Sequence, residues 1–126
     1  MARPKANQLT ERELELMQIF WDHGQLTVAE VQEELAAKGR DLAYTTVATL
    51  VKILHEKQFV DQIGHVRPFT FQPKRTFEEV SGNILGDIVK KVFGGSREKL
   101  LIRLMEQKRL SKKERKLLEE ILEDNE

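Results

Sequence analysis

The chain contains no cysteine among its 126 residues. This absence excludes disulfide bonds, zinc sites with cysteine ligands, thiolate nucleophiles and iron–sulfur clusters. No apolar run approaches the ~20 residues that a membrane-spanning helix needs. The first thirteen residues, MARPKANQLTERE, include no apolar segment of the kind found in secretory signals. We therefore expect a cytoplasmic protein of one ordinary domain, or of two very small ones.

Neither sign of charge dominates the chain, but the charges are unevenly placed. There are 21 Lys and Arg against 21 Asp and Glu. Residues 9–39 hold two basic and seven acidic side chains, whereas residues 40–75 hold six basic and three acidic ones. Because a local basic face attracts an anionic partner whatever the total charge, the segment 40–75 is a candidate for nucleic-acid binding. A solvated mixture of charges is the alternative interpretation.

Four capping boxes predict where helices begin. In this motif a Ser or Thr side chain accepts a hydrogen bond from the backbone N–H three residues on, and the Glu at that position accepts one in return. Each of the four precedes apolar residues at helical spacing, which strengthens the prediction. The pairs are Thr10/Glu13, Thr27/Glu30, Thr76/Glu79 and Ser111/Glu114.

Residues 9–75 predict three helices followed by a β-hairpin. The first two helices cover about residues 10–22 and 27–38, and the third starts near residues 41–43 and ends near residue 57. The β-type runs 60–63 and 69–71 flank a glycine-containing loop at 64–68. This order is that of a winged helix, a helix-turn-helix whose hairpin forms the wing. The expected buried residues are Leu14, Met17, Phe20 and Trp21 in the first helix, Val28, Val31 and Leu35 in the second, and Val47, Leu50, Val51 and Leu54 in the third.

Residues 76–126 predict three further amphipathic helices. The first carries Phe77, Val80, Ile84, Ile88 and Val92 along one face and ends at Gly94-Gly95, and the others follow Ser96 and Ser111. About 50 residues are marginal for closing a core alone, so we expect two chains to share one. The predicted fold class is mainly α with a small β-hairpin: a winged-helix DNA-binding domain at 1–75 and a helical dimerisation domain at 76–126. Folding of these helices onto their own winged helix is the alternative.

The third helix presents a face of unusual composition. At 100° per residue, Thr45, Thr49, Lys52 and Glu56 lie opposite its apolar residues. Solvated faces are normally rich in Glu, Lys and Gln, since threonine is a mediocre helix former. Small hydroxyl side chains allow close approach to base edges, and Lys52 suits a phosphate. In the hairpin loop, Arg67 suits a phosphate or the minor groove. Threonines without a function, and a merely solvated Arg67, are the alternatives.

No combination of residues points to catalysis or to a bound metal. His23, His55 and His65 lie on three different elements and share no ligand spacing. The Gly94-Gly95-Ser96 sequence lacks the spacing of a phosphate-binding loop, and the end of one helix followed by the start of another explains it better. We therefore expect no enzyme activity, no metal and no cofactor.

With its elements placed, the chain resembles the penicillinase-repressor family, the BlaI/MecI type. The stretch 43–50, AYTTVATL, resembles the family's recognition helix and is the most specific match. The segment 9–17 with Trp21 resembles its first helix, residues 59–60, 64–71 and 72–73 continue the pattern through the wing, and residues 110–122 resemble the final helix. The resemblance implies a dimeric transcriptional repressor that binds a two-fold symmetric operator of β-lactam-resistance or related genes.

Carried over by position, the resemblance implies a DNA-contacting set of Tyr44, Thr45, Thr46 and Thr49, with Lys52 and Arg67 as backbone or groove contacts. It also implies a β-lactam-induced membrane sensor peptidase, whose action leads to repressor cleavage in the dimerisation domain. The family's cleaved Asn-Phe bond aligns with Arg103-Leu104 here. Copper-responsive members end in a cysteine-rich motif that this chain lacks, so thiolate metal sensing is not expected. A winged-helix module that binds protein and not DNA is the alternative function.

Overall fold

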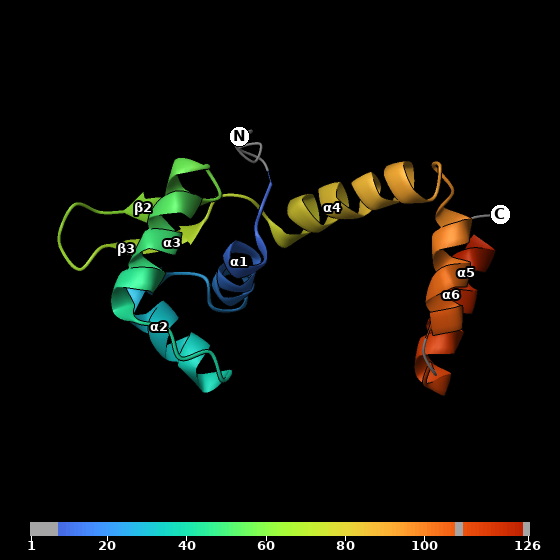
Figure 1. The fold of residues 1–126 in the computed structure, drawn as a ribbon, viewed down its shortest axis with the longest axis horizontal. Helices are drawn as coiled ribbons and strands as arrows, with labels where there is room; N and C mark the ends of the chain where they lie inside the picture. Colours follow the sequence, from blue (N-terminus) through green and yellow to red (C-terminus); the bar gives the residue numbers. More distant parts are fainter. Residues whose placement is uncertain (1–7, 108–109, 125–126) are drawn as a thin grey trace. The chain divides into compact units, whose positions relative to one another are not determined.

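The computed structural model describes the backbone of residues 8–107 and 110–124 and the side chains of residues 8–107 and 110–120. The chain divides into two compact units, residues 1–80 and 81–126 (Figure 1). The first unit holds α1 (Glu11–His23), β1 (Leu26–Thr27), α2 (Val28–Ala37), α3 (Tyr44–Glu56), β2 (Val60–Ile63), β3 (Thr70–Pro73) and the first turn of α4 (Phe77–Val92). The second holds the rest of α4, α5 (Arg97–Gln107) and α6 (Lys112–Asp124).

The helices begin where the capping boxes predict. The Thr10 hydroxyl accepts from the Glu13 backbone N–H at 3.2 Å, and the Thr10 N–H donates to the Glu13 carboxylate at 3.2 Å. The same reciprocal pair forms between Thr27 and Glu30 and between Ser111 and Glu114. Thr76 likewise accepts from the Glu79 N–H at 3.1 Å. Local sequence therefore fixes these starts, because each motif satisfies backbone donors that a helix leaves unpaired.

The core of the first unit lies between the three helices and the sheet. Met17, Phe20, Val31 and Leu35 are buried as expected, and so are Val47, Val51 and Leu54. Four other expected core residues, Leu14, Trp21, Val28 and Leu50, are only partly buried. Leu16 and Ile19 are fully buried in their place on α1. The buried stripe of α1 is therefore displaced from the predicted one, and this helix contacts both α2 and α3.

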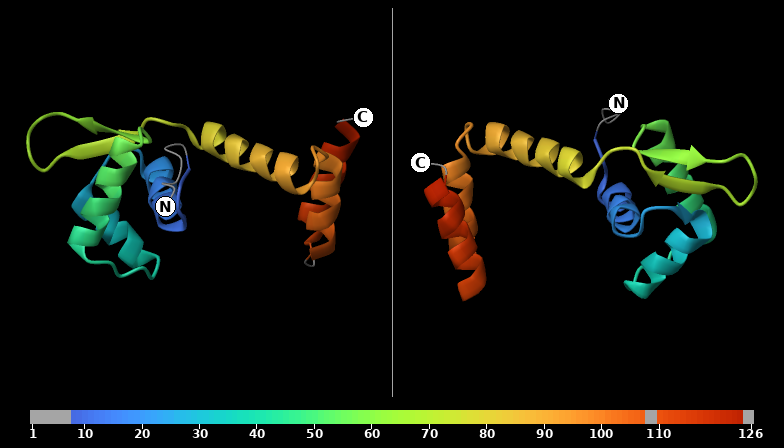
Figure 2. Two further views of the ribbon diagram at one scale, coloured as in Figure 1. Left: turned by 45° about the horizontal axis from the view of Figure 1, so that its top comes forward. Right: turned by 180° about the vertical axis from the view of Figure 1, so that it is seen from behind.

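The sheet has three antiparallel strands in the order β1-β3-β2. The hairpin of β2 and β3 pairs Val60 with Pro73 and Ile63 with Thr70, close to the predicted limits. β1 was not predicted, because two residues show no alternation and their pairing, Leu26 with Phe71, joins distant parts of the chain. Through β1 the wing is bonded to the connection between α1 and α2, and its loop extends beyond the helices (Figure 2).

The second unit buries little apolar surface by itself. α5 has no buried residue, and α4 contributes only Val89 to the buried set of this unit. The large apolar side chains that stay exposed in the described part of this unit are Ile84, Leu85, Ile88, Val92, Ile102, Leu104 and Leu117. Apart from Val80, which is buried in the first unit, the face predicted for α4 is thus open.

Candidate nucleic-acid interface

The orientation of α3 follows from how its apolar side is packed. Val47, Val51 and Leu54 are each at most 1% exposed in the core. The connection before the helix is held by the Gln32 amide, which donates to the Leu42 carbonyl at 3.0 Å. With one side fixed in the core, the opposite side of α3 must face outwards.

The outward side carries most of the residues expected to contact DNA. Tyr44 is 51% exposed, Thr45, Thr49 and Lys52 are exposed, and Thr46 is half-buried at the edge. The Thr49 hydroxyl donates to the Thr45 carbonyl at 2.9 Å. This bond within the helix uses the only proton of the Thr49 hydroxyl, so the side chain presents a methyl group and an acceptor oxygen to any partner.

A groove of about 670 Å³ lies between α3, the start of α2 and the wing. Tyr44, Ala48 and Lys52 line it from α3, while Arg67, Pro68 and Phe69 line it from the wing. The structure therefore brings Tyr44, Lys52 and Arg67 onto one surface. Thr45, Thr46 and Thr49 are not among the residues that line this groove.

Arg67 is less free than an ordinary loop arginine. Its guanidinium carbon lies 5.6 Å from the centre of the Phe69 ring, within range of a cation–π interaction. Phe69 is itself half-buried and packs against the core. The wing thus holds the charge of Arg67 beside the groove.

Lys52 and Arg67 also differ in ion pairing from the other basic side chains of residues 40–75. Of the six basic side chains in residues 40–75, four form ion pairs: Arg40 with Glu15, Lys57 with Glu13, Lys74 with Asp61 and Arg75 with Glu79. Lys52 and Arg67 form none with the residues that the structure describes. The unneutralised positive charge of this segment is therefore concentrated at the groove.

Two features of this surface were missed from the sequence. Phe69 was expected only as a strand residue, and the start of α2, with Thr27, Val28 and Ala29, was not expected to line the site.

Lys57 was counted in the basic segment, although it is largely buried and its ammonium lies 2.7 Å from the Glu13 carboxylate. Only the folded chain could reveal these neighbours, because each pairing joins residues from different elements.

The described residues contain no group of three or more His, Asp or Glu side chains that could hold a metal ion. Nor does the described part contain a helix long and apolar enough to cross a membrane.

Comparison with known proteins gives concordant matches. The family model described as penicillinase repressor matches residues 9–124. The transcriptional regulator BlaI of Mycobacterium tuberculosis, in two strains, is 34% identical over 104 residues, which cover 81% of this chain and 75% of that protein. The solution structure of the DNA-binding domain of the repressor BlaI superposes with a TM-score of 0.52 and 26% identity, covering 61% of this chain and 93% of that one. A ferric uptake regulator from Francisella tularensis shares the fold, with a TM-score of 0.50 and 12% identity over 75% of this chain and 86% of that chain.

Proposed function

Because the chain belongs to the penicillinase repressor family, we propose that it is a dimeric repressor of β-lactam-resistance or related genes, acting at a two-fold symmetric operator. The family is one of transcriptional repressors, so the protein is a winged-helix DNA-binding regulator and not an enzyme. We place its action in the cytoplasm, where operator DNA is found.

The observation that carries this proposal is the position of Lys52 and Arg67, which form no ion pair with the residues that the structure describes. Lys52 on α3 and Arg67 on the wing line the same groove, and α3 presents its threonine face beside it. A recognition helix in the major groove needs small side chains towards the bases and cations towards the flanking phosphates. We assign base contacts to Thr45, Thr46 and Thr49, a contact at the edge of the groove to Tyr44, and backbone or minor-groove contacts to Lys52 and Arg67.

The second unit supports the dimeric part of the proposal. Ile88 and Val92 on α4, Ile102 and Leu104 on α5 and Leu117 on α6 are all exposed in the single chain. Leaving such apolar surface in water is unfavourable, and a second copy that presents the same surface would cover it. Two linked winged helices would then bind two half-sites, which raises affinity by ~10²–10⁴ over one.

For release, we propose cleavage within this unit by a membrane sensor peptidase that responds to β-lactam. The candidate bond, Arg103-Leu104, lies in α5, where both side chains are exposed. Loss of the segment after residue 103 would remove α6 and leave every proposed DNA contact in place.

A gel-shift titration tests the DNA-binding proposal directly. The full-length chain is titrated against the region upstream of its own operon and against an unrelated duplex of equal length and composition. We expect at least ~10³-fold tighter binding to the upstream region, as specific regulators show. Equal, weak binding to both duplexes would instead favour the alternative, a winged-helix module that binds protein.

A further inference from the structure

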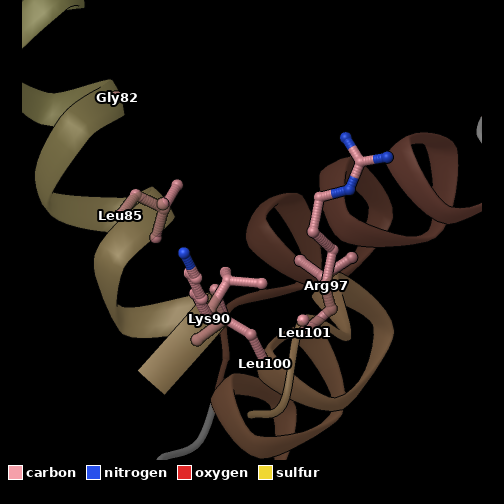
Figure 3. Close-up of a pocket in the computed structure, with 9 residues that line it drawn as sticks. Gly82, Leu85, Lys90, Arg97, Leu100 and Leu101 are labelled. Atoms are coloured by element: carbon pink, nitrogen blue, oxygen red, sulfur yellow. The ribbon is translucent and has the colours of Figure 1, made fainter. Parts of the chain in front are cut away.

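One ion pair of the first unit is shielded from solvent. Lysine side chains of this chain are otherwise exposed wherever the structure describes them, as Lys90 is near the end of α4 (Figure 3). The side chain of Lys57 is only 16% exposed. Its partner, Glu13, is the only polar or charged residue in the described part of the chain that is buried. The fold therefore encloses two opposite charges at this one place among the residues described.

The two charges belong to a network of hydrogen bonds. The Lys57 ammonium donates to a Glu13 carboxylate oxygen at 2.7 Å and to the Gln8 carbonyl at 3.0 Å. The same Glu13 oxygen accepts from the Thr10 N–H at 3.2 Å, within the capping box that begins α1. The capping box thus holds the carboxylate in place, and the carboxylate holds the ammonium.

This network joins the start of α1 to the end of α3. Glu13 lies in the first turn of α1, and Lys57 is the residue that directly follows α3. Thr49, the nearest of the proposed base contacts, precedes Lys57 by eight residues, which is about 12 Å along a helix axis. The ion pair can therefore influence contacts with the bases only through the position of the helix itself.

The other contacts of α3 restrain its position less strictly. Val47, Val51 and Leu54 are buried, but burial of apolar surface is non-directional. At the start of α3, Ala43 supplies no side-chain cap, and the Gln32 amide holds only the connection before the helix. A charge-assisted hydrogen bond, in contrast, requires a defined distance and angle. The bond from Lys57 is thus a directional restraint on the end of this helix.

A buried ion pair is a poor means of gaining stability. Removing two charges from water offsets much of their attraction, and an apolar pair of similar size is often as stable. We propose that Glu13 and Lys57 are positioning residues for DNA recognition, whose ion pair sets the orientation of α3 and so aligns its threonine face with the bases. The inference rests on the proposed operator binding through α3, and it adds two residues that determine specificity without touching DNA.

A charge-neutral double variant tests this role. Lys57→Met removes the ammonium, and Glu13→Gln removes the carboxylate but keeps an oxygen that can accept from the Thr10 N–H. Since one positive and one negative charge are lost together, attraction to phosphates should not change. We expect about tenfold or more weaker binding to the region upstream of the operon, with unchanged affinity and salt slope on an unrelated duplex.

The matched control removes an exposed ion pair from the same unit. Asp22→Asn with Lys38→Met is also charge-neutral, and this pair joins α1 to the residue after α2 with both side chains exposed. The control should keep the wild-type ratio of affinities for the two duplexes. Thermal unfolding of each variant establishes that it is folded at the temperature of the titrations.

The outcomes separate positioning from operator binding itself. A folded double variant with the wild-type affinity ratio would overturn the inference and leave the proposed function intact. Equal weakening on both duplexes would overturn it as well, because the pair would then support binding of any DNA. A wild type with no preference for its upstream region would reject the proposed operator binding and, with it, the positioning role.

Two single substitutions keep the test decisive if the double variant does not fold. Lys57→Arg keeps the charge and can donate to both Glu13 and the Gln8 carbonyl, so the affinity ratio should stay within about threefold of the wild type. Glu13→Asp keeps both charges but withdraws the carboxylate by one methylene, and we expect the ratio to fall about threefold or more. A wild-type ratio in Glu13→Asp would show that recognition does not depend on where this carboxylate lies.

Discussion

At the scale of single residues, Lys52 on α3 gives the sharpest prediction. Lys52 is proposed to contact a phosphate, so Lys52→Ala should weaken binding to the cognate and unrelated duplexes alike. Its loss should also reduce the salt dependence of binding by about one unit of slope for each chain bound. Lys38→Ala is the matched control, because it removes the same charge from an exposed site outside the groove. Affinities measured at several salt concentrations check both variants, and an unchanged slope in Lys52→Ala would contradict the phosphate contact.

Thr49 should behave differently from Lys52. Its hydroxyl proton is already used by the Thr45 carbonyl, so its methyl group is the better candidate for base contact, for example with a thymine methyl. Thr49→Ala should therefore cost ~1–3 kcal/mol at the cognate site with an unchanged salt slope. Thr49→Val keeps a methyl group at the same place and should lose less. If Thr49→Val is as weak as Thr49→Ala in the same titrations, the hydroxyl and not the methyl makes the contact.

The ion pair between Glu15 and Arg40 predicts a pH dependence of stability. Hydrogen bonds from the Arg40 guanidinium, together with its charge, hold the pKa of Glu15 below the ordinary 4.5. A carboxylate with a lowered folded-state pKa stabilises the fold above its unfolded pKa, and this contribution is lost as the pH falls through the folded-state value. Arg40→Ala should therefore lower the Tm at pH 7, and the difference from the wild type should close as the pH falls below about 4.5. A Tm difference that stays constant from pH 7 to pH 3 would rule out this linkage.

At the scale of secondary-structure elements, the residue that follows α3 has an unfavourable backbone conformation. Gln58 has a φ of 69°, a left-handed conformation that favours glycine. It follows the helix in a Schellman arrangement, in which the Gln58 N–H donates to the His55 carbonyl at 3.1 Å and the Phe59 N–H to the Leu54 carbonyl at 2.9 Å. Gln58→Gly should relieve ~1 kcal/mol of backbone strain. The substitution also loses an exposed hydrogen bond from Lys74, and glycine increases the conformational entropy of the unfolded chain. Because both effects oppose the relief of strain, we expect a net stabilisation of about 0.5 kcal/mol.

Urea unfolding of the full-length chain measures the effect at Gln58. Gln58→Ala is the matched control, because it loses the same side-chain bond and keeps the strained backbone. We expect it to be no more stable than the wild type. Equal stabilisation by Gly and Ala would show that the backbone conformation carries no cost at this position.

The elements also show which parts of the fold are readable from sequence. Helix starts were predictable because a capping box is complete within four residues. The outward threonine face of α3 was predictable because helical periodicity fixes which residues oppose the core. β1 and the groove were not, because Leu26 pairs with Phe71, and Lys52 and Arg67 come to line one groove, only after the chain has folded. The roles of the groove residues at DNA, and the functional division at residue 75, stay predictions.

At the scale of the whole molecule, the two units should separate in function. Val80 is buried in the core of the first unit, and the Phe77 ring packs edge-on against Trp21 at 5.3 Å between centroids. A fragment of residues 1–80 should therefore fold as a monomer and bind a single half-site, whereas a fragment of residues 1–74 should be less stable because it lacks both contacts. Sedimentation and thermal unfolding of the two fragments check this. Tight dimerisation of the 1–80 fragment would contradict a dimer held by residues 81–126.

Release from DNA should follow from severing the second unit. A protease binds an extended segment, so α5 must unwind locally before Arg103-Leu104 is cut. Little opposes this within one chain, since α5 spans only residues 97–107 and has no buried side chain, and an isolated helix of that length is marginal. The glycines at 94 and 95, both at positive φ, separate it from α4. Cleavage would remove α6, and the loss of linkage should lower affinity for the whole operator ~10²–10⁴-fold while half-site affinity stays unchanged.

Two experiments separate this linkage argument from the identity of the protease. In vitro, a specific protease site inserted between Gly94 and Gly95, in the connection between α4 and α5, allows the chain to be cut on demand, and operator affinity should fall while half-site affinity does not. In cells, immunoblots before and after a β-lactam, with target expression followed in parallel, should show a fragment ending near residue 103 as derepression begins. Derepression with the chain intact would reject cleavage as the signal. Operator affinity that survives the cut in vitro would instead reject the dependence of binding on the linked dimer.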